Sequence, residues 1–299
     1  MSQTYRSGVA AILGPPNAGK STLLNQLLRQ KIAIVSPKPQ TTRNRIMGVM
    51  HGENYQIILL DTPGLHEARE EMNRRMIRAA LEAVAEADVA VYLADASDPA
   101  AQKPARIEYQ LTALAQAQCP VLLALNKIDL LPKEKLLPLM DWYQRQYSFA
   151  AIIPLSALKG DGVDRLVDEL VMRLPEGPQY YPDDMLTDVS ERFLAAEIVR
   201  ESIFLRTRAE VPYSTAVLID LFDESTSPLR IVATIIVERS SQKGIVIGKD
   251  GAMLGQIRQQ ATAEISRVFE RPVRLELWVK VQKNWTEKKD LLQSLGLPG

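Results

Sequence analysis

The sequence lacks the features that mark secreted and membrane-spanning chains. Its 299 residues include one cysteine, Cys119, so no internal disulfide forms and a buried thiol in a reducing compartment is expected. No stretch approaches the roughly eighteen consecutive apolar residues of a membrane span. The apolar run near the N-terminus is expected to be a first strand, not a signal peptide. The 36 basic and 36 acidic residues cancel, so any phosphate-binding surface must be local.

The chain is long enough for two domains, each with its own core. From residue 7 to about 173, short apolar runs alternate with helical patterns, which predicts a doubly wound, mostly parallel α/β sheet. The predicted strands are Val9–Leu13, Ile46–Met50, Gln56–Leu60, Val89–Ala94, Val121–Leu125 and Ala151–Leu155. The predicted helices are 19–29, 73–86, 104–118, 133–147 and 162–173. Such sheets bind ligands at the carboxyl ends of their strands.

A phosphate-binding loop follows the first predicted strand. The residues from Gly14 to Ser21 read G-x-x-x-x-G-K-S and include Asn17, Ala18 and Gly19. The glycines let the backbone curl around phosphate oxygens, and the helical pattern from Ser21, which includes Thr22, puts the phosphates at a helix N-terminus. Lys20 can reach the outer phosphates, and the Ser21 hydroxyl can bind Mg²⁺.

Three further motifs follow later strands. In Asp61-Thr-Pro-Gly64, the Asp61 carboxylate can hold Mg²⁺ through water and the Gly64 N–H can face a terminal phosphate. In Asn126-Lys127-Ile-Asp129, the Asp129 carboxylate can accept hydrogen bonds from guanine N1–H and its 2-amino group. Adenine lacks this donor pair, and a site built for it rejects bases that leave the carboxylate unpaired. The Lys127 stem can lie along the base, and Asn126 can tie this loop to the phosphate loop.

The fourth motif is Ser156-Ala157-Leu158, where a backbone amide could meet the guanine carbonyl. The four motifs together resemble the translation-factor-like GTPases. That resemblance implies GTP/GDP binding, Mg²⁺ and hydrolysis, with Lys20, Thr42, Asp61 and Gly64 as catalytic residues. A P-loop kinase or ATPase is the rival, against which Asn126–Asp129 argues. A passive RNA-binding protein with an inactive nucleotide domain is another, against which the intact Lys20 and Ser21 argue.

The polar segment from Ala33 to Arg45 contains two prolines and is expected to be a mobile loop. In GTPases such a loop orders when a Thr meets Mg²⁺ and the γ-phosphate, for which Thr42 is the first candidate and Thr41 the next. The alternative is that Thr-Thr-Arg starts a strand. Residues 65–71 would form the second switch. Leu65 stands where Ras-like proteins have the water-orienting Gln, so slow intrinsic hydrolysis is expected.

Asn17 has two interpretations that the sequence does not separate. Related GTPases with Pro-Asn-x-Gly-Lys-Ser can bind K⁺ through this Asn, whereas Asn is also a common turn residue.

A proline-rich segment, residues 176–188, is predicted to be a semi-stiff linker between a GTP-binding domain (1–175) and a second domain (189–299). The second domain is expected to contain a helix at 190–206, capped by Asp188 or Ser190, and a helix at 252–269. The expected strands are Ser214–Asp220, Arg230–Glu238 and Arg274–Val281.

Gly248-Lys249-Asp250-Gly251 lies before the second of these helices and matches the G-x-x-G clamp of KH domains, which holds about four nucleotides of single-stranded RNA. The element order resembles the type II KH fold. Residues 239–289 contain eleven Lys/Arg and five Asp/Glu, a net charge of +6, although residues 180–299 have a net charge of −1. Lys243 and Lys249 are the best phosphate-contact candidates, followed by Arg239 and Lys280.

A GTPase domain followed by a type II KH domain resembles the Era family of bacterial ribosome-assembly GTPases. The resemblance covers almost the whole chain, including Gln40–Arg43, Val246–Gly248 and Leu275–Val281. It implies a GTP-hydrolysing switch that binds 16S ribosomal RNA near its 3′ end and assists maturation of the small (30S) subunit. It also implies a cytoplasmic location with loose association to the inner membrane.

One residue, Gly255, departs from the family pattern. Gly255 stands where the family usually has Lys, which removes a phosphate contact and weakens the helix by roughly 1 kcal/mol relative to Ala. A GTPase acting in RNA modification is an alternative function. Nothing in the sequence demands an oligomer, so a monomer is expected.

Overall fold

The structure is a computed structural model of the 299-residue chain, and it describes residues 4–38, 41–64, 71–99, 107, 111, 114–115 and 117–295. The chain forms two compact units. The first consists of Met1–Ile32, Thr42–Glu67 and Met76–Asp188, and the second of Ala33–Thr41, Ala68–Arg75 and Val189–Gly299. The segment 33–41 therefore belongs to the second unit, which differs from the contiguous division that the sequence suggested.

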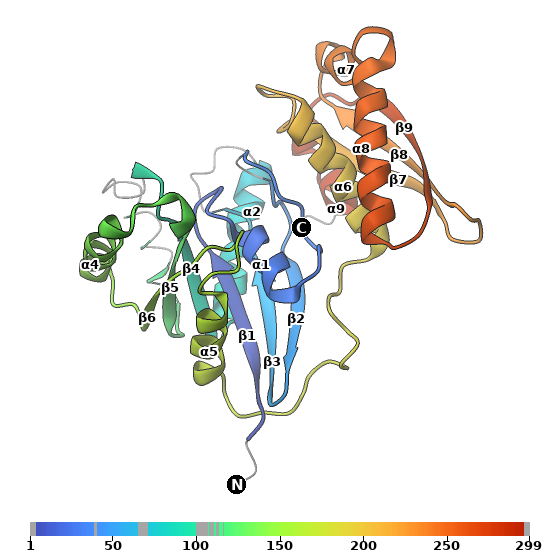
Figure 1. The fold of residues 1–299 in the computed structure, drawn as a ribbon. Coiled ribbons are helices and arrows are strands. Elements are labelled where there is room, and N and C mark those ends of the chain that lie inside the picture. Colours follow the sequence, from blue (N-terminus) through green and yellow to red (C-terminus); the bar gives the residue numbers. More distant parts are fainter. Residues whose placement is uncertain are drawn as a thin grey trace. The chain divides into compact units, whose positions relative to one another are not determined.

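The first unit is built on a six-stranded sheet in the order β2-β3-β1-β4-β5-β6 (Figure 1). All neighbouring strands are parallel except β2 and β3, which form an antiparallel pair. The strands are β1 (Arg6–Leu13), β2 (Ile46–Gly52), β3 (Tyr55–Asp61), β4 (Val89–Asp95), β5 (Val121–Asn126) and β6 (Ala151–Pro154). The central strands β4 and β5 are almost wholly buried, as expected for parallel strands covered on both faces.

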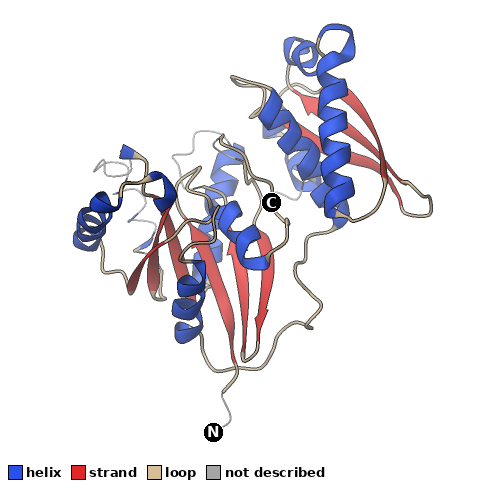
Figure 2. Ribbon diagram, viewed as in Figure 1, coloured by secondary structure: helices blue, strands red, loops and turns tan. Residues whose placement is uncertain are grey.

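Helices cover both faces of this sheet (Figure 2). They are α1 (Lys20–Leu28), α2 (Glu71–Ala85), α4 (Leu136–Gln146) and α5 (Val163–Arg173). Short 3₁₀ turns, η2 (Ile128–Leu130) and η3 (Lys133–Lys135), precede α4. One core cluster joins α2 and α4 to the sheet through Ala80, Val84 and Tyr143. The predicted α/β fold is confirmed, whereas most of the predicted helix 104–118 lies outside the described residues.

Residues 176–188, predicted to be a linker, are bound along the first unit. The Gln56 side chain accepts hydrogen bonds from the backbone N–H groups of Tyr180 (2.8 Å) and Tyr181 (3.0 Å). The Val49 N–H donates to Leu186 O at 2.8 Å, and the Thr187 hydroxyl donates to Met47 O at 2.6 Å. These bonds hold the segment against β2 and β3, so most of it is not a free connection.

The second unit is a three-stranded sheet, ordered β7-β8-β9, with helices packed on it. Its elements are α6 (Glu191–Arg206), β7 (Thr215–Asp223), β8 (Leu229–Val237), α7 (Ser240–Ile247), η4 (Lys249–Gly251), α8 (Ala252–Val268), β9 (Val273–Val281), η5 (Trp285–Glu287) and α9 (Lys289–Ser294). β7 and β8 are antiparallel, and β8 and β9 are parallel. The apolar faces of α6 and α8 and the inner face of the sheet share one core.

Of the two caps proposed for α6, the structure selects Ser190. Its hydroxyl accepts a 3.2 Å hydrogen bond from the Phe193 N–H, which is the usual N-cap geometry. After β9 the chain turns back, and the buried Trp285 indole donates to Ser214 O at 2.8 Å. Among the described residues, no helix has both the length and the apolar character needed to cross a membrane.

Candidate nucleotide and RNA sites

The phosphate loop follows β1, and there is no room for a side chain at either of its two glycines. Gly14 has a φ of +145°, and a Cβ there would lie 2.2 Å from Leu93 O. Gly19 has a φ of +99°, and a Cβ there would lie 2.3 Å from Asn126 Nδ2. α1 begins at Lys20, so Ser21 and Thr22 stand in its first turn, where backbone N–H groups favour an anion.

Lys20 is buried and bound to the phosphate loop itself. Its Nζ donates to Gly14 O and Pro15 O, both at 3.1 Å, and the residue is 6% exposed. Burial lowers the pKa of Lys20 to about 8, against the opposing effect of the nearby Asp61 carboxylate. A bound phosphate would stabilise the charged ammonium, which is the form that a polyphosphate needs.

Three oxygen-bearing side chains meet beside Lys20. Ser21 Oγ donates to Asp61 Oδ2 at 2.7 Å and lies 2.6 Å from Thr42 Oγ1. Asp61 is fully buried, and its Oδ1 has no hydrogen-bond partner. Burial raises the pKa of Asp61 to about 6, partly offset by Lys20 and by the hydrogen bond from Ser21. Two hydroxyls and a carboxylate with an unused oxygen fit Mg²⁺, which prefers oxygen ligands.

Gly64 brings the Asp-Thr-Pro-Gly motif against the phosphate loop. A Cβ on Gly64 would lie 2.9 Å from the N, Cα and Cγ atoms of Pro16. The Thr62 hydroxyl donates to Ile12 O at 2.8 Å and so fixes the start of the motif to β1. Leu65 and the rest of the predicted second switch up to residue 70 lie outside the described residues.

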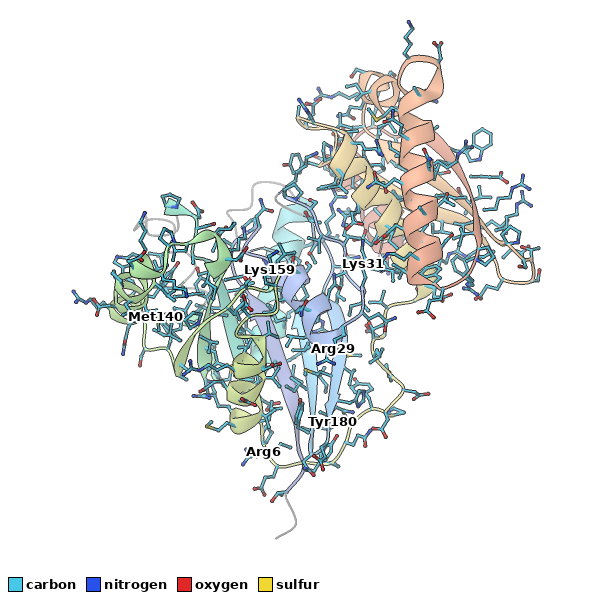
Figure 3. All side chains as sticks on the ribbon, in the orientation of Figure 1. Arg6, Arg29, Lys31, Met140, Lys159 and Tyr180 are labelled. Atoms are coloured by element: carbon cyan, nitrogen blue, oxygen red, sulfur yellow. The ribbon has the colours of Figure 1, made fainter. Side chains whose placement is uncertain are left out.

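Asn126 links three loops of the first unit. Its Nδ2 donates to Ala18 O at 2.7 Å, and its Oδ1 accepts a 2.9 Å hydrogen bond from the Ala157 N–H. Because the Ala157 amide is already bound to Asn126, a base carbonyl would have to share or replace that bond. Ser156 is buried, and Leu158 is 71% exposed. Figure 3 shows Lys159, next in this loop, at the end of the sheet opposite Arg6.

The other residues of the base motif lie just after β5. Asp129 is exposed in η2, where its carboxylate can meet a base. Lys127 has a φ of +66°, and its Nζ lies 2.5 Å from Asp95 Oδ2. Sequence analysis missed Asp95, although its position at the carboxyl end of a predicted strand was a sufficient reason to inspect it.

Residues 33–38 and 41, part of the segment 33–45 predicted to be a mobile loop, pack against α6 within the second unit. Ile34 is 1% exposed and belongs to that unit's core. The Val35 N–H donates to Glu201 Oε1 at 2.8 Å, and Lys38 Nζ donates to the carbonyls of Phe204 and Thr207 at the end of α6. The Thr41 carbonyl accepts a hydrogen bond from Arg200. The prediction overlooked the apolar Ile34, whose burial provides the anchor.

The G-x-x-G turn joins α7 to α8. Gly248 and Gly251 have φ values of +74° and +78°, and Asp250 has a φ of +52°. A Cβ on Gly248 would lie 2.7 Å from Met253 Cβ, whereas a Cβ on Gly251 or Gly255 meets no atom within 4 Å. Lys249 is exposed at the tip and Lys243 is half-buried on α7. The turn therefore exposes a side-chain-free backbone next to Lys249, as contact with a nucleic-acid phosphate requires.

Ion pairs neutralise part of the basic excess of residues 239–289, away from this turn. Arg267 pairs with Glu264, Arg271 with Glu191 and Glu224, and Arg274 with Glu276. Arg239 and Lys283 line a cavity of about 290 Å³ near the start of α7, together with Glu238. The basic side chains that remain for phosphate contacts are thus those on and near α7, such as Lys243 and Lys249, and not all of those that the charge count includes.

Comparisons with known proteins also divide the chain into a nucleotide-binding part and an RNA-binding part. A family model described as a 50S ribosome-binding GTPase matches residues 9–127, and a KH-domain model matches residues 210–286. The chain is 49% identical to the GTPase Era of Syntrophus aciditrophicus over 98% of this chain and 95% of that protein. It is 50% identical to the GTPase Era of Geobacter metallireducens over 98% of both chains.

Two solved structures are similar over nearly their full length. One is Era in complex with MgGDPNP and nucleotides 1506–1542 of 16S ribosomal RNA, with a TM-score of 0.93, 40% identity and coverage of 99% of this chain and 100% of that chain. The other is an Aquifex aeolicus Era variant bound to GDP·AlF4⁻, with a TM-score of 0.93, 40% identity and coverage of 98% and 100%.

Proposed function

Because this chain belongs to the Era family of GTPases, we propose that it is a GTP-hydrolysing switch that binds 16S ribosomal RNA near its 3′ end and assists assembly of the small (30S) subunit. The main support for nucleotide binding is the pair of hydrogen bonds by which Asn126 connects the phosphate loop to the loop that contains Ala157. The turn Gly248–Gly251, with Lys249 at its tip, carries the RNA half.

The residues of the first unit divide the work on the nucleotide. The phosphate loop and Lys20 bind the phosphates, and Asp129 selects guanine. Ser21, Thr42 and Asp61 would hold Mg²⁺, for which the unused Asp61 Oδ1 is the specific observation. Bound Mg²⁺ neutralises charge on the phosphates. Gly64 approaches the phosphate loop closely enough for its motif to respond to the terminal phosphate.

We place the coupling between the nucleotide and RNA in residues 33–42. Thr42 belongs with Ser21 in the first unit, and residues 33–41 belong with α6 in the second. A ligand shifts an equilibrium only if it binds two states unequally. GTP meets this condition if Thr42 binds the Mg²⁺ of the GTP complex but makes no such contact in the GDP complex.

The test is binding of a single-stranded oligonucleotide that matches the 3′ end of 16S ribosomal RNA, at fixed salt. We expect tighter binding with a non-hydrolysable GTP analogue than with GDP. Equal binding would contradict the coupling, and no binding in either state would contradict the RNA substrate.

Hydrolysis separates a switch from a passive RNA-binding protein. Lys20→Ala removes the ammonium that reaches the phosphates, so we expect hydrolysis to fall by at least about a hundredfold. Competition of GTP with ATP tests the kinase or ATPase alternative. An active wild-type chain that ATP does not inhibit excludes both alternatives, whereas equal rates in wild type and variant would contradict the proposed site.

Asn17 is the candidate ligand for K⁺. Hydrolysis in KCl compared with NaCl tests this role, since a K⁺ ligand predicts a faster rate in KCl.

We propose a monomer in the cytoplasm that associates loosely with the inner membrane. Light scattering tests the mass, and cell fractionation at low and high salt tests the membrane association.

A further inference from the structure

The carboxylate of Asp95, at the carboxyl end of β4, uses both of its oxygens. Oδ1 accepts hydrogen bonds from the Ser97 N–H at 2.9 Å and from the Ser97 hydroxyl at 2.6 Å. Oδ2 accepts the Lys127 ammonium at 2.5 Å. The side chains of Asp95 and Lys127 are 16% and 30% exposed. Ser97 therefore fixes the orientation in which Asp95 meets Lys127.

The backbone holds the same two segments together. Asp95 pairs with Asn126 in the parallel register of β4 and β5, and the Ala96 N–H donates to Asn126 O at 2.9 Å. Lys127 follows at once, with a left-handed φ of +66°, a backbone conformation that residues with a side chain adopt uncommonly. Lys127 is thus held at its ammonium by Asp95 and next to a residue, Asn126, whose backbone is fixed by strand pairing.

We propose that Asp95 is a positioning residue that sets the affinity for guanine nucleotides by holding the Lys127 side chain extended beside the base. This inference rests on the proposed function, in which the Lys127 stem lies along guanine. An untethered lysine loses side-chain conformational entropy when it is ordered, and lysine is among the residues that lose most. Asp95 imposes that order before the nucleotide binds, so binding no longer bears the full cost.

A double-mutant cycle on the full chain tests this inference. The variants are Asp95→Ala, Lys127→Ala and their combination, and the readouts are the dissociation constant and release rate of fluorescent GDP. We expect Asp95→Ala to weaken binding about tenfold through faster release. The double variant should match Lys127→Ala, because Asp95 acts through Lys127. Additive effects, or no effect of Asp95→Ala, would overturn the inference.

The cycle also separates this inference from the proposed function. If Lys127→Ala binds GDP as the wild type does, Lys127 has no role at the base, and both the assignment of Lys127 and the role of Asp95 fail. If Lys127→Ala weakens binding and Asp95→Ala does not, only the inference about Asp95 fails.

Inosine diphosphate supplies a readout that general loosening of the site would not reproduce. It lacks the 2-amino group that Asp129 recognises but keeps the ring faces along which Lys127 lies. Asp95→Ala should therefore weaken GDP and inosine diphosphate by the same factor, and a changed ratio would overturn the proposal. Asp141→Ala breaks the exposed 2.7 Å pair with Arg145 on α4 and is the matched control, for which we expect unchanged binding.

Discussion

Ser21 donates a 2.7 Å hydrogen bond to Asp61, and its own oxygen lies 2.6 Å from the Thr42 hydroxyl. A serine hydroxyl has a single hydrogen, so when the ionised Asp61 accepts it, Thr42 is the donor in its contact with Ser21. The three side chains form a directed chain from Thr42 to Ser21 to Asp61. Because it ends on a carboxylate with one unused oxygen, the same atoms that bond to one another can bind a cation.

The buried carboxylate predicts a pH-dependent stability difference in the nucleotide-free, Mg²⁺-free protein. The pKa of Asp61 rises from 3.8 to about 6 on folding, so above pH 6 folding buries a charge and is destabilised by about 3 kcal/mol. As the pH falls from 6 towards 4, the folded state takes up the proton and the penalty disappears. Asp61→Asn should therefore unfold at higher urea than wild type at pH 7.5, with the difference shrinking near pH 4. Lower stability of the variant at both pH values would contradict this account.

Base selection predicts a change of nucleotide with Asp129→Asn. The exposed Asp129 carboxylate would accept two hydrogen bonds from guanine, each worth about 1.5–3 kcal/mol to a charged group. An amide cannot accept both, so GDP affinity should fall by roughly 10²–10⁴-fold. Xanthosine diphosphate, which has a carbonyl at position 2, should bind the variant better than GDP does. Competition of the two nucleotides against fluorescent GDP measures the ratio, and an unchanged preference for GDP would remove Asp129 from the base site.

The RNA clamp predicts unequal effects at its two glycines. Gly248→Ala and Gly251→Ala both place a side chain at a positive φ, but only the Gly248 Cβ collides with Met253. RNA binding should therefore fall further in Gly248→Ala, and further still in Gly248→Asp, which adds a negative charge. GTP binding measured on the same samples should not change. If GTP affinity falls together with RNA affinity, the two units do not divide the work as proposed.

Gly255 offers a gain of function. A Cβ there meets no atom within 4 Å, so Gly255→Ala should stabilise α8 by about 1 kcal/mol. Gly255→Lys should in addition tighten RNA binding, with a salt dependence steeper by about one unit in the logarithmic slope. Thermal unfolding and RNA titrations from 50 to about 200 mM salt distinguish the two variants. Identical RNA affinity for Ala and Lys at this position would place it outside the phosphate-contact surface.

The sequence predicted those parts of the molecule that depend on local patterns. The strand runs, the phosphate loop and the G-x-x-G turn are contiguous, and their residue types dictate their backbone. Contacts between distant residues left no such pattern. Asp95 acquires its partner only when β4 and β5 pair, and Ile34 acquires its place only in the core of the second unit. Residues 176–188 were polar and proline-rich, but the hydrogen bonds of Gln56 and Val49 hold them to the first unit.

The bond from Asn126 to Ala18 spans 108 residues, which constrains when a newly made chain can bind guanine nucleotide. A ribosome synthesises the phosphate loop early, but Asn126 comes with β5 and the Ala157 amide comes only after β6. A ligand stabilises only the state that binds it. The base-binding loops that Asn126 joins therefore come together, and the nucleotide can stabilise the folded form fully, only once β6 has left the exit tunnel and paired.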